Sequence, residues 1–378
     1  MKKIIALVLA LAMMLVLCAC GGGVMNDTSK DDGGNASASN GKTYEWRLAS
    51  AWGEGSRQFE FDQRFCDKVA EMSNGRLTIK CYGAGQLAAT TEVFDLVASG
   101  DVEVGSDAPQ YWSGKNTAFD LLGYNVLGLD ASDYLTWYFG GDGYQITKDL
   151  YHKYGLEYFY TAITNPESGI RSNSQITGLA DLEGKSIRMS GNVIGKVLGK
   201  LGITSTSMTL DEAVDGLEKG VIDAMEYSSP VMDQTMQIYE IAKFWIGPGF
   251  HQTAAPYGIM FNQEAYDSLD DELKNIIDVC AKANLLEAYG ENMYGDATAT
   301  QDMLENQGVT MSYFSAEDLA KIENARNEVY EEMAAENPDF ALVAASQMDY
   351  FKTITYYQQE FLGDYSSTRI PTTYPKLG

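Results

Sequence analysis

The chain has 378 residues, with 53 aspartates and glutamates against 27 lysines and arginines, which gives a formal net charge of −26 at pH 7. A surface this acidic repels nucleic acid and anionic lipid headgroups, so neither is expected as a direct binding partner. The sequence holds two histidines, His152 and His251, and no CxxC pair, which leaves little to build a zinc site or a histidine-based catalytic triad.

The first residues of the chain indicate a targeting segment. A short basic stretch, residues 1–3 (MKK), precedes an almost wholly apolar stretch at 4–17 that is too short to span a bilayer comfortably, and LCAC stands at 17–20. This order resembles a bacterial lipoprotein signal with its lipobox, which implies that residues 1–19 are removed and that Cys20 carries a diacylglyceryl group. The mature chain would then be extracytoplasmic and lipid-anchored to the bacterial plasma membrane. Its net charge would be −28, because the removed segment contains two lysines.

The next segment is predicted to be a flexible tether. Residues 20–42 are rich in glycine, serine, asparagine and aspartate, so they cannot bury enough apolar surface to fold. The remaining cysteines are Cys66, Cys81 and Cys280, whose sequence surroundings suit half-buried core positions. The chain beyond the tether is long enough for two lobes, each with its own core.

The first lobe is predicted over residues 43–164 and opens with a βαβαβ unit. Residues 44–50 (YEWRLAS) alternate as a strand, and residues 56–73 carry apolar side chains at helical spacing. The later elements are expected as a strand at 77–82, a helix at 90–97 and a strand at 102–106. This order of elements predicts a parallel sheet.

The second lobe is predicted over residues 165–253, around a second βαβαβ unit at 179–227. Its first strand carries Arg188, and its last strand ends at Glu226. Ligands of such units bind at the carboxyl ends of the strands, so this cation and carboxylate are placed to face a small polar solute. The two units together predict an α/β protein with two lobes and a ligand cleft between them.

The rest of the chain is predicted to return to the first lobe and then to become helical. Residues 254–263 contain a strand at 257–262 (YGIMFN), and residues 264–378 read as a helical region. The helices are expected from 268 to about 306, at 315–337 and at 340–362. The first of them is long enough to brace both lobes.

Eight short segments form an ordered set. They are 72–80 (MSNGRLTIK), 85–87 (GQL), 111–116 (YWSGKN), 138–141 (YFGG), 179–184 (LADLEG), 187–191 (IRMSG), 220–226 (GVIDAME) and Phe250-His251. Together they resemble the solute-binding proteins of TRAP (tripartite ATP-independent periplasmic) transporters, and most closely the subgroup that binds 2-oxo acids and related monocarboxylates. The resemblance implies a two-lobed fold of the periplasmic-binding-protein type, no enzymatic activity, and delivery of a small organic carboxylate to TRAP membrane permease subunits.

The resemblance assigns a role to Arg188. This residue matches the arginine that grips the ligand carboxylate in that family, and a guanidinium can meet a carboxylate with two parallel hydrogen bonds. Without the surrounding match, Arg188 would be interpreted as a surface residue at a strand edge, paired with a neighbouring acid.

The resemblance also implies a metal site. In the subgroup, a cation bridges ligand and protein through a glutamine, a glutamate and the aromatic residue after that glutamate. Glu226 matches the glutamate, Tyr227 stands where tryptophan is common, and Glu167 falls at the glutamine position. Two carboxylates favour Ca²⁺ over Na⁺, because each additional anionic oxygen ligand stabilises a divalent ion more than a monovalent ion. In the alternative, Glu167 is a solvated loop carboxylate and Glu226 alone touches the site. No organic cofactor is implied.

Other candidate ligand-binding residues carry less information. Arg171 aligns with a tryptophan of the subgroup but lies near an arginine of the sialic-acid and dicarboxylate receptors, so it indicates either a larger or more acidic ligand or a surface role. Tyr111 and Trp112 match an aromatic pair that lines the cleft, although one of the two is expected in the core. Phe250 and Gln252 are weaker candidates on the same grounds.

Two other functions remain open from the sequence. An ABC-type receptor for sugars or peptides would use stacking aromatics and amides in place of Arg188 and Glu226. A secreted hydrolase would use Glu167 and Glu226 as acid and base, although an acid beside an arginine is expected to have a lowered pKa, which suits a general acid poorly. The subgroup can pair through its C-terminal helices, so a homodimer is left open as well.

Overall fold

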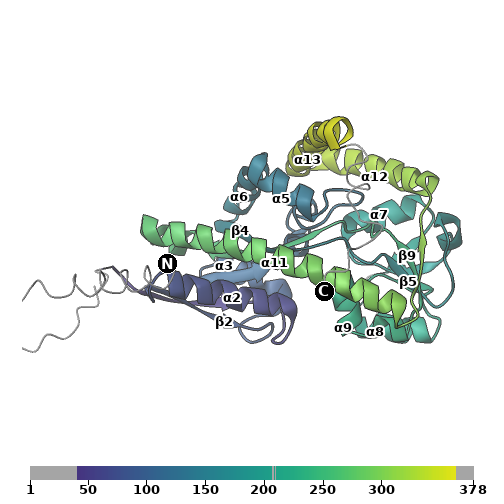
Figure 1. Cartoon of the computed structure of the whole chain (residues 1–378). Helices are drawn as coiled ribbons and strands as arrows, with labels where there is room; N and C mark the ends of the chain where they lie inside the picture. The colour runs from purple at the N-terminus through teal and green to yellow at the C-terminus, as the bar shows by residue number, and fades with distance from the viewer. Residues whose placement is uncertain (1–40, 207, 209, 363–378) are drawn as a thin grey trace, which may run out of the picture. The chain divides into compact units, whose positions relative to one another are not determined.

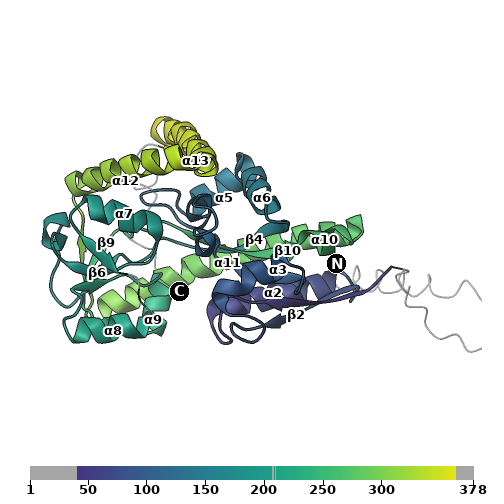
Figure 2. The ribbon, with the colours of Figure 1, turned by 180° about the vertical axis from the view of Figure 1, so that it is seen from behind.

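The computed structural model describes residues 41–206, 208 and 210–362. The predicted signal at 1–19, the lipidation site Cys20 and the tether up to residue 40 lie outside the described residues. From residue 43 onward the chain folds around two separate β-sheets, with helices packed against each (Figures 1 and 2).

The first sheet has five strands in the order β2-β1-β3-β10-β4. β1 pairs in parallel with both β2 and β3, while β10 pairs antiparallel with β3 and β4. The predicted βαβαβ unit and the returning strand are therefore confirmed. The strands are β1 (Tyr44–Ala49), β2 (Leu77–Tyr82), β3 (Val104–Asp107), β4 (Leu156–Thr164) and β10 (Ala255–Asn262).

Local sequence explains the helices of this first unit. The hydroxyl of Ser56 accepts a hydrogen bond from the backbone N–H of Phe59, which caps α2 (Arg57–Met72) at its start. Asn74 and Gly75 adopt positive φ angles and end the helix. The second predicted helix is split into a 3₁₀ turn, η1 (Thr90–Glu92), and the α-helix α3 (Val93–Ala98).

The second sheet has six strands in the order β11-β9-β5-β8-β6-β7. β6 lies between β7 and β8 and pairs in parallel with both, as β1 does with its neighbours in the first sheet, so the two predicted units share one topology. The edge strand β11 was not predicted: it lies within the predicted helical region, between the helices expected to end near 306 and to begin at 315. The strands are β5 (Ile170–Ser172), β6 (Ser186–Arg188), β7 (Thr204–Thr206), β8 (Ala224–Met225), β9 (Phe244–Gly247) and β11 (Thr310–Tyr313).

Short connections and helices complete this second sheet. The helices α7 (Asn192–Lys200) and α8 (Leu210–Glu218) link the strands of the parallel unit, and α9 (Pro230–Thr235) follows it. Besides η1, the described residues form the 3₁₀ turns η2 (Pro109–Trp112) in the first lobe, and η3 (Leu179–Leu182) and η4 (Ile238–Glu240) in the second.

Two short connections without a helix carry the chain between the two sheets. Residues 165–169 lead from β4 to β5, and residues 248–254 lead from β9 to β10. The two crossings touch each other, because the N–H of Glu167 donates a hydrogen bond to the carbonyl oxygen of Gln252 at 3.1 Å. Side chains on these segments are therefore placed at the junction of the two lobes.

Long helices span this junction. α11 (Asp271–Glu305) packs against β4 and α2 of the first lobe and against α9 of the second, as the brace predicted from the sequence would. α12 (Ala316–Glu336) packs on α7, and α13 (Pro338–Tyr357) packs on α4 and α6, along the upper edge in Figure 1. The remaining helices are α4 (Ala118–Gly123), α5 (Ala131–Gly140), α6 (Gly143–His152), α10 (Gln263–Asp267) and the terminal π-helical turn η5 (Gln358–Leu362).

Buried apolar side chains hold these elements together. All nine residues of β4 are buried, because this strand lies between α6 and α11. Cys66 and Cys280 are buried and Cys81 is half-buried, and none of the three forms a disulfide, as expected for core thiols. Within the part of the chain that the structure describes, none of the helices combines the length and the apolar character needed to cross a membrane.

Candidate functional site

Three buried polar side chains meet where the lobes join. Glu167 lies on the first crossing segment, His251 lies on the second, and Glu226 directly follows β8. One ligating atom from each residue lies within 4.8 Å of the others, which is close enough for one ion to contact all three. The fold brings these residues together although they are up to 84 positions apart in the sequence.

Hydrogen bonds fix the orientation of the two carboxyl groups. His251 Nε2 lies 2.8 Å from Glu167 Oε2. On the other side, Glu226 Oε1 accepts hydrogen bonds from Arg188 Nη1 at 2.5 Å and from the backbone N–H of Ser190 at 2.8 Å. Each carboxyl group thus has a partner within the protein and still lies close to the other carboxyl group.

Burial changes the protonation of this cluster. Removal from water raises the pKa of Glu167 to about 8, against the opposing charge of Arg171. Removal from water and the neighbouring Glu167 raise the pKa of Glu226 to about 7, although Arg188 opposes this. Burial lowers the pKa of His251 to about 4, so its imidazole is neutral at pH 7. The contact between His251 and Glu167 is therefore a hydrogen bond between a neutral imidazole and a largely protonated carboxyl group, and not an ion pair.

The donor set fits a cation. Two carboxyl groups and an imidazole offer oxygen and nitrogen ligands, and oxygen-rich sets suit hard ions such as Ca²⁺, while imidazole is also compatible with borderline divalent metals. A positive charge between Glu167 and Glu226 would offset the repulsion that now raises the pKa of Glu226. The predicted alternative in which Glu167 is a solvated loop carboxylate is wrong, because this side chain is buried.

Arg188 is part of the same constellation. It ends β6, its side chain is 12% exposed, and its guanidinium donates to the carbonyl oxygen and the carboxylate of Glu226. Its Nε also donates to the carbonyl oxygen of Met208 at 3.2 Å. The arginine is therefore held at the carboxyl end of a parallel strand, beside a residue that could hold a cation.

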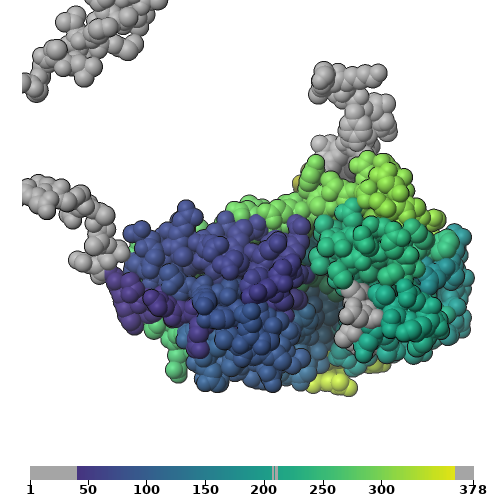
Figure 3. Space-filling view, turned by 90° about the horizontal axis from the view of Figure 1, so that it is seen from below, coloured from purple at the N-terminus to yellow at the C-terminus, as the bar shows by residue number. Residues whose placement is uncertain are grey.

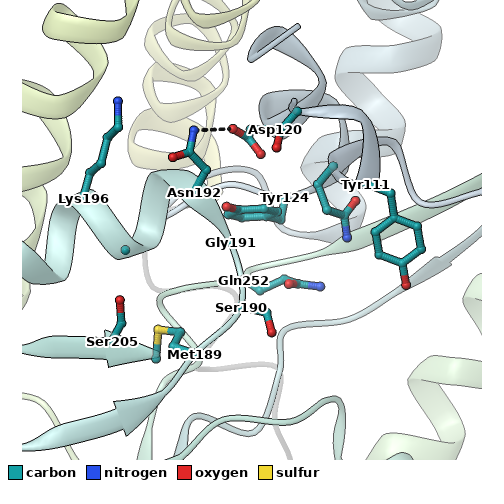
Figure 4. A pocket seen from close by; sticks show the side chains of 13 residues that line it. Tyr111, Asp120, Tyr124, Met189, Ser190, Gly191, Asn192, Lys196, Ser205 and Gln252 are labelled. Carbon is teal, nitrogen blue, oxygen red and sulfur yellow. Dashed lines mark hydrogen bonds between the residues drawn. The ribbon is translucent and has the colours of Figure 1, made fainter. Parts of the chain in front are cut away.

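A cavity of about 650 Å³ is lined from both lobes (Figure 4). Ser190, whose N–H donates to Glu226, and Gln252, which follows His251, both line it, whereas Glu167, Arg188, Glu226 and His251 do not. Asp120 and Asn192 face each other across it, with Asn192 Nδ2 3.5 Å from Asp120 Oδ2. Figure 3 shows the groove between the purple-to-blue first lobe and the teal second lobe. The lining consists of Gln110, Tyr111, Ser113, Asp120, Tyr124, Met189, Ser190, Gly191, Asn192, Gly195, Lys196, Ser205 and Gln252.

The predicted aromatic residues divide between the cavity and the core. Tyr111 is 45% exposed and lines the cavity, as does Gln252. Trp112 does not line it: this ring is buried, and its Nε1 donates to Asp107. The two side chains belong to the 3₁₀ turn η2, where successive residues point about 120° apart, so they cannot both face the cavity.

Two further candidates are corrected or refined by their placement. Phe250 is fully buried against Phe314, so it belongs to the core and not to the cavity wall. Tyr227 is half-buried and packs against an apolar cluster of the second lobe that includes Met225 and Ile238.

Arg171 has neither of the roles expected for it. It lies on β5, between β9 and β8, and is fully buried, so the surface role is wrong. Its guanidinium forms an ion pair with the equally buried Asp233 and does not line the cavity. Asp233 and the ring of Trp245 enclose this side chain, which is 0% exposed.

His251 belongs to this site although it was not predicted as a site residue. In the sequence it stands out only as the end of a matched segment and as one of two histidines. Asp233 and Asn192 were not singled out either. The adjacency of His251 to Gln252, on the segment leading back to the first lobe, was the available signal.

Comparison with known proteins identifies the family. The family model described as DctP, bacterial extracellular solute-binding protein, family 7, matches residues 48–337. The chain belongs to this family. It is therefore an extracytoplasmic solute receptor of the TRAP type and not an enzyme, which rules out the hydrolase.

Individual relatives refine the placement of this receptor. It is 26% identical over 301 residues to a monocarboxylate 2-oxoacid-binding periplasmic protein of Nostoc sp., covering 79% of this chain and 81% of that protein. It is similar to a TRAP periplasmic solute-binding protein of Colwellia psychrerythraea with bound calcium and pyruvate, at 31% identity and a TM-score of 0.80, over 86% of this chain and 100% of the other. It is also similar to a TRAP periplasmic solute-binding protein from Pseudoalteromonas atlantica with bound sodium and pyruvate. The identity is 29% and the TM-score is 0.79, over 86% of this chain and 99% of the other.

The pKa of Glu226 is not lowered by its arginine neighbour, contrary to the expectation for an acid beside an arginine. Arg188 does act in that direction, but burial and the charge of Glu167 outweigh it, and the pKa rises. Membership of a family of solute receptors, and not this pKa, excludes catalysis.

Proposed function

We propose that this receptor binds a small monocarboxylate of the 2-oxo or hydroxy acid class together with a cation, and delivers it to a TRAP membrane permease. The observation that carries the proposal is the buried group of Glu167, Glu226 and His251 beside Arg188, at the junction of the two lobes. The homologues named above, with pyruvate and either calcium or sodium, support the same ligand class.

The cation site is proposed to use Glu167 and Glu226 as its anionic ligands, with Tyr227 and His251 beside them. When bound, the cation would supply positive charge to these carboxylates and to the ligand oxygens. Because the site offers two carboxyl groups, we expect a divalent ion such as Ca²⁺ to be preferred over Na⁺. Arg188 would hold the ligand carboxylate through its guanidinium, whose planar donors match two oxygens.

Delivery is proposed to depend on closure of the lobes. We assign residues 43–164 with 254–263 to the first lobe, residues 165–253 to the second, and residues 264–378 to the bracing region. The cavity is lined from both lobes, so a ligand seated there contacts both and favours their approach. The permease could then distinguish the closed receptor from the open one.

Calorimetry tests the proposal. After treatment with a chelator, the receptor is titrated with pyruvate in the presence of Ca²⁺, Na⁺ or neither. We expect pyruvate to bind at least tenfold more tightly with Ca²⁺ than without either cation. Arg188→Ala should weaken binding tenfold or more, because charge-assisted hydrogen bonds contribute about 1.5–3 kcal/mol.

A matched control is Arg47→Ala, which removes an arginine paired with Glu103 in the first lobe, away from the site. This variant should bind pyruvate normally. The proposal would be contradicted if neither chelation nor Arg188→Ala changed the affinity for pyruvate. It would also be contradicted if the receptor bound neutral sugars in place of carboxylates.

The membrane anchor is a separate proposal. We propose that Cys20 is lipidated and holds the receptor at the outer face of the plasma membrane, on the support of the signal-like residues before it. Cys20→Ser should release the receptor from washed membranes, whereas a variant that stays membrane-bound would argue against lipid attachment at this residue.

A further inference from the structure

Arg171 contacts both chain segments that carry the carboxyl groups of the site. Its Nη1 donates to the carbonyl oxygen of Gly169 at 2.6 Å, and its Nη2 donates to that of Ser228 at 2.6 Å. Gly169 lies two residues after Glu167, and Ser228 lies two residues after Glu226. The guanidinium therefore ties together the two segments whose separation sets the distance between the carboxyl groups.

The same segments are constrained from other directions. The N–H of Ser168 donates to the carbonyl oxygen of Ser228 at 3.1 Å, which joins them directly. Gly169 has a φ of 100°, and a Cβ there would lie 2.1 Å from the carbonyl oxygen of Ile246, so the backbone is closely packed against β9. The backbone that Arg171 contacts at Gly169 therefore has little room to move.

The charge of Arg171 is balanced without the ligand. Asp233, on α9, forms an ion pair with it, and both side chains are 0% exposed. The indole of Trp245 lies 5.3 Å from the guanidinium carbon on another side. A guanidinium enclosed in this way cannot bind a ligand carboxylate. Its hydrogen bonds and its ion pair are instead made to groups of the protein.

From these contacts we infer that Arg171, neutralised by Asp233, is a positioning residue that holds Glu167 and Glu226 at the spacing a bound cation requires. The inference rests on the proposed function, because it assumes that a cation and a carboxylate bind there. The inference also bears on the class of ligand. Because Arg171 is enclosed, Arg188 supplies the guanidinium that remains at the site among the described residues, and one guanidinium suits a ligand with one carboxylate.

The test replaces the ion pair with apolar side chains of similar volume. Arg171→Met combined with Asp233→Leu removes both buried charges together, a change that often leaves stability unaltered, whereas removing one partner leaves an uncompensated charge. We expect a folded variant in which Ca²⁺ binds at least tenfold more weakly and pyruvate affinity no longer responds to Ca²⁺. A purely structural ion pair predicts normal Ca²⁺ and pyruvate affinities in any variant that folds, and that result would overturn the inference.

Two further variants make the outcome decisive. Arg171→Lys keeps the charge but cannot reach both carbonyl oxygens, so it should show an intermediate loss of Ca²⁺ affinity; unchanged affinity would also overturn the inference, even if the double variant fails to fold. Arg326→Met is the control, since Arg326 is a buried arginine on α12 that donates to the carbonyl oxygen of Leu127 and pairs with Glu323 rather than with Glu167 or Glu226. It should lower stability without changing Ca²⁺ affinity.

Failure of the proposed function gives a different pattern. In that case the unmodified receptor and Arg326→Met would both fail to bind Ca²⁺ and pyruvate. If both bind normally and the Arg171 variants do too, the proposed function stands and the positioning role does not.

Discussion

Under the proposed function, Glu167 occupies the position that decides which cation the site prefers. It is buried, shares a hydrogen bond with neutral His251, and lies within reach of Glu226. Two carboxyl groups so close together and so far from water cannot both ionise easily, which is why burial and mutual repulsion raise the pKa of Glu226. A cation bound between the two carboxyl groups would favour their ionised forms and lower both pKa values.

Glu167→Gln should change the cation preference of the receptor. The substitution removes one negative charge but keeps an oxygen that can accept the N–H of His251. We expect Ca²⁺ affinity to fall tenfold or more at pH 7, and the pKa of Glu226 to fall because a like charge is gone. Calorimetric titration with Ca²⁺ and with Na⁺ measures the change.

The control for this substitution is Glu317→Gln on α12, where the glutamate is largely exposed and paired with Lys321. It should leave cation binding unchanged. Equal Ca²⁺ affinity in Glu167→Gln and the unmodified receptor would remove Glu167 from the proposed set of ligands.

Single residues were predicted from sequence with uneven success. Matched segments pointed to Arg188 and Glu226, which the structure joins by an ion pair, but nothing in the sequence showed that Arg171 would be enclosed with Asp233, 62 positions away. His251 was missed for the same reason. Contacts between distant segments depend on the tertiary fold, and a pattern read along the chain does not contain them.

At the scale of elements, α4 of the first lobe meets the start of α7 in the second. Gly191 precedes α7 with a φ of 125°, and a Cβ there would lie 2.2 Å from the hydroxyl oxygen of Tyr124. Asp120 and Asn192 make the neighbouring contact across the cavity. Glycine is required here both for the backbone conformation and for the approach of the tyrosine.

Gly191→Ala should therefore destabilise the receptor and push the lobes apart at this point. Strain at a left-handed position and the clash with Tyr124 are expected to cost about 1–3 kcal/mol. Thermal unfolding measures the loss of stability, and small-angle X-ray scattering measures the radius of gyration, which should increase.

Gly199→Ala is the matched control on the same helix. A Cβ at this exposed position has no heavy atom within 4 Å among the described residues, and alanine favours a helix over glycine by up to about 1 kcal/mol. It should leave stability unchanged or raise it. Equal unfolding temperatures for the two variants would show that the contact between Tyr124 and Gly191 does not constrain the lobes.

Elements with a strong periodic pattern were predicted best. The helices expected at 315–337 and from 268 to about 306 correspond to α12 and α11, because their capping residues Ser315 and Asp270 mark their starts. β11 was missed: it is a short edge strand of four residues with no clear alternation, and it forms because β9 offers it a parallel partner. Pairing with a distant strand overrides weak local preference.

At the scale of the whole molecule, buried carboxyl groups outside the site extend the pH argument. Burial raises the pKa of Asp62, Asp107 and Asp120 to about 7 in each case, although hydrogen bonds oppose the shift. With Glu226 at about 7 and Glu167 at about 8, the folded receptor holds protons that the unfolded chain releases near pH 4.

These shifts set the direction in which stability changes with pH. A carboxyl group whose pKa is raised on folding stabilises the receptor below its unfolded pKa, and this contribution is lost as pH rises through the folded value. His251 acts in the opposite direction, since its lowered pKa costs stability as pH falls from 6.5 toward 4. Between pH 6.5 and 8.5 the carboxyl groups therefore dominate, and the net charge of the acidic chain adds repulsion in the same direction.

The ligand-free receptor should consequently unfold at a temperature several degrees lower at pH 8.5 than at pH 6.5. Ca²⁺ should raise the unfolding temperature more at pH 8.5, because Glu167 and Glu226 are then ionised and no proton must be displaced when the cation binds. Thermal unfolding at both pH values, with and without Ca²⁺, measures this. In Glu167→Gln combined with Glu226→Gln, the Ca²⁺ effect should vanish while part of the pH effect remains, since Asp62, Asp107 and Asp120 still titrate. An unfolding temperature that rises between pH 6.5 and 8.5 would show that these carboxyl groups do not control the stability of the receptor.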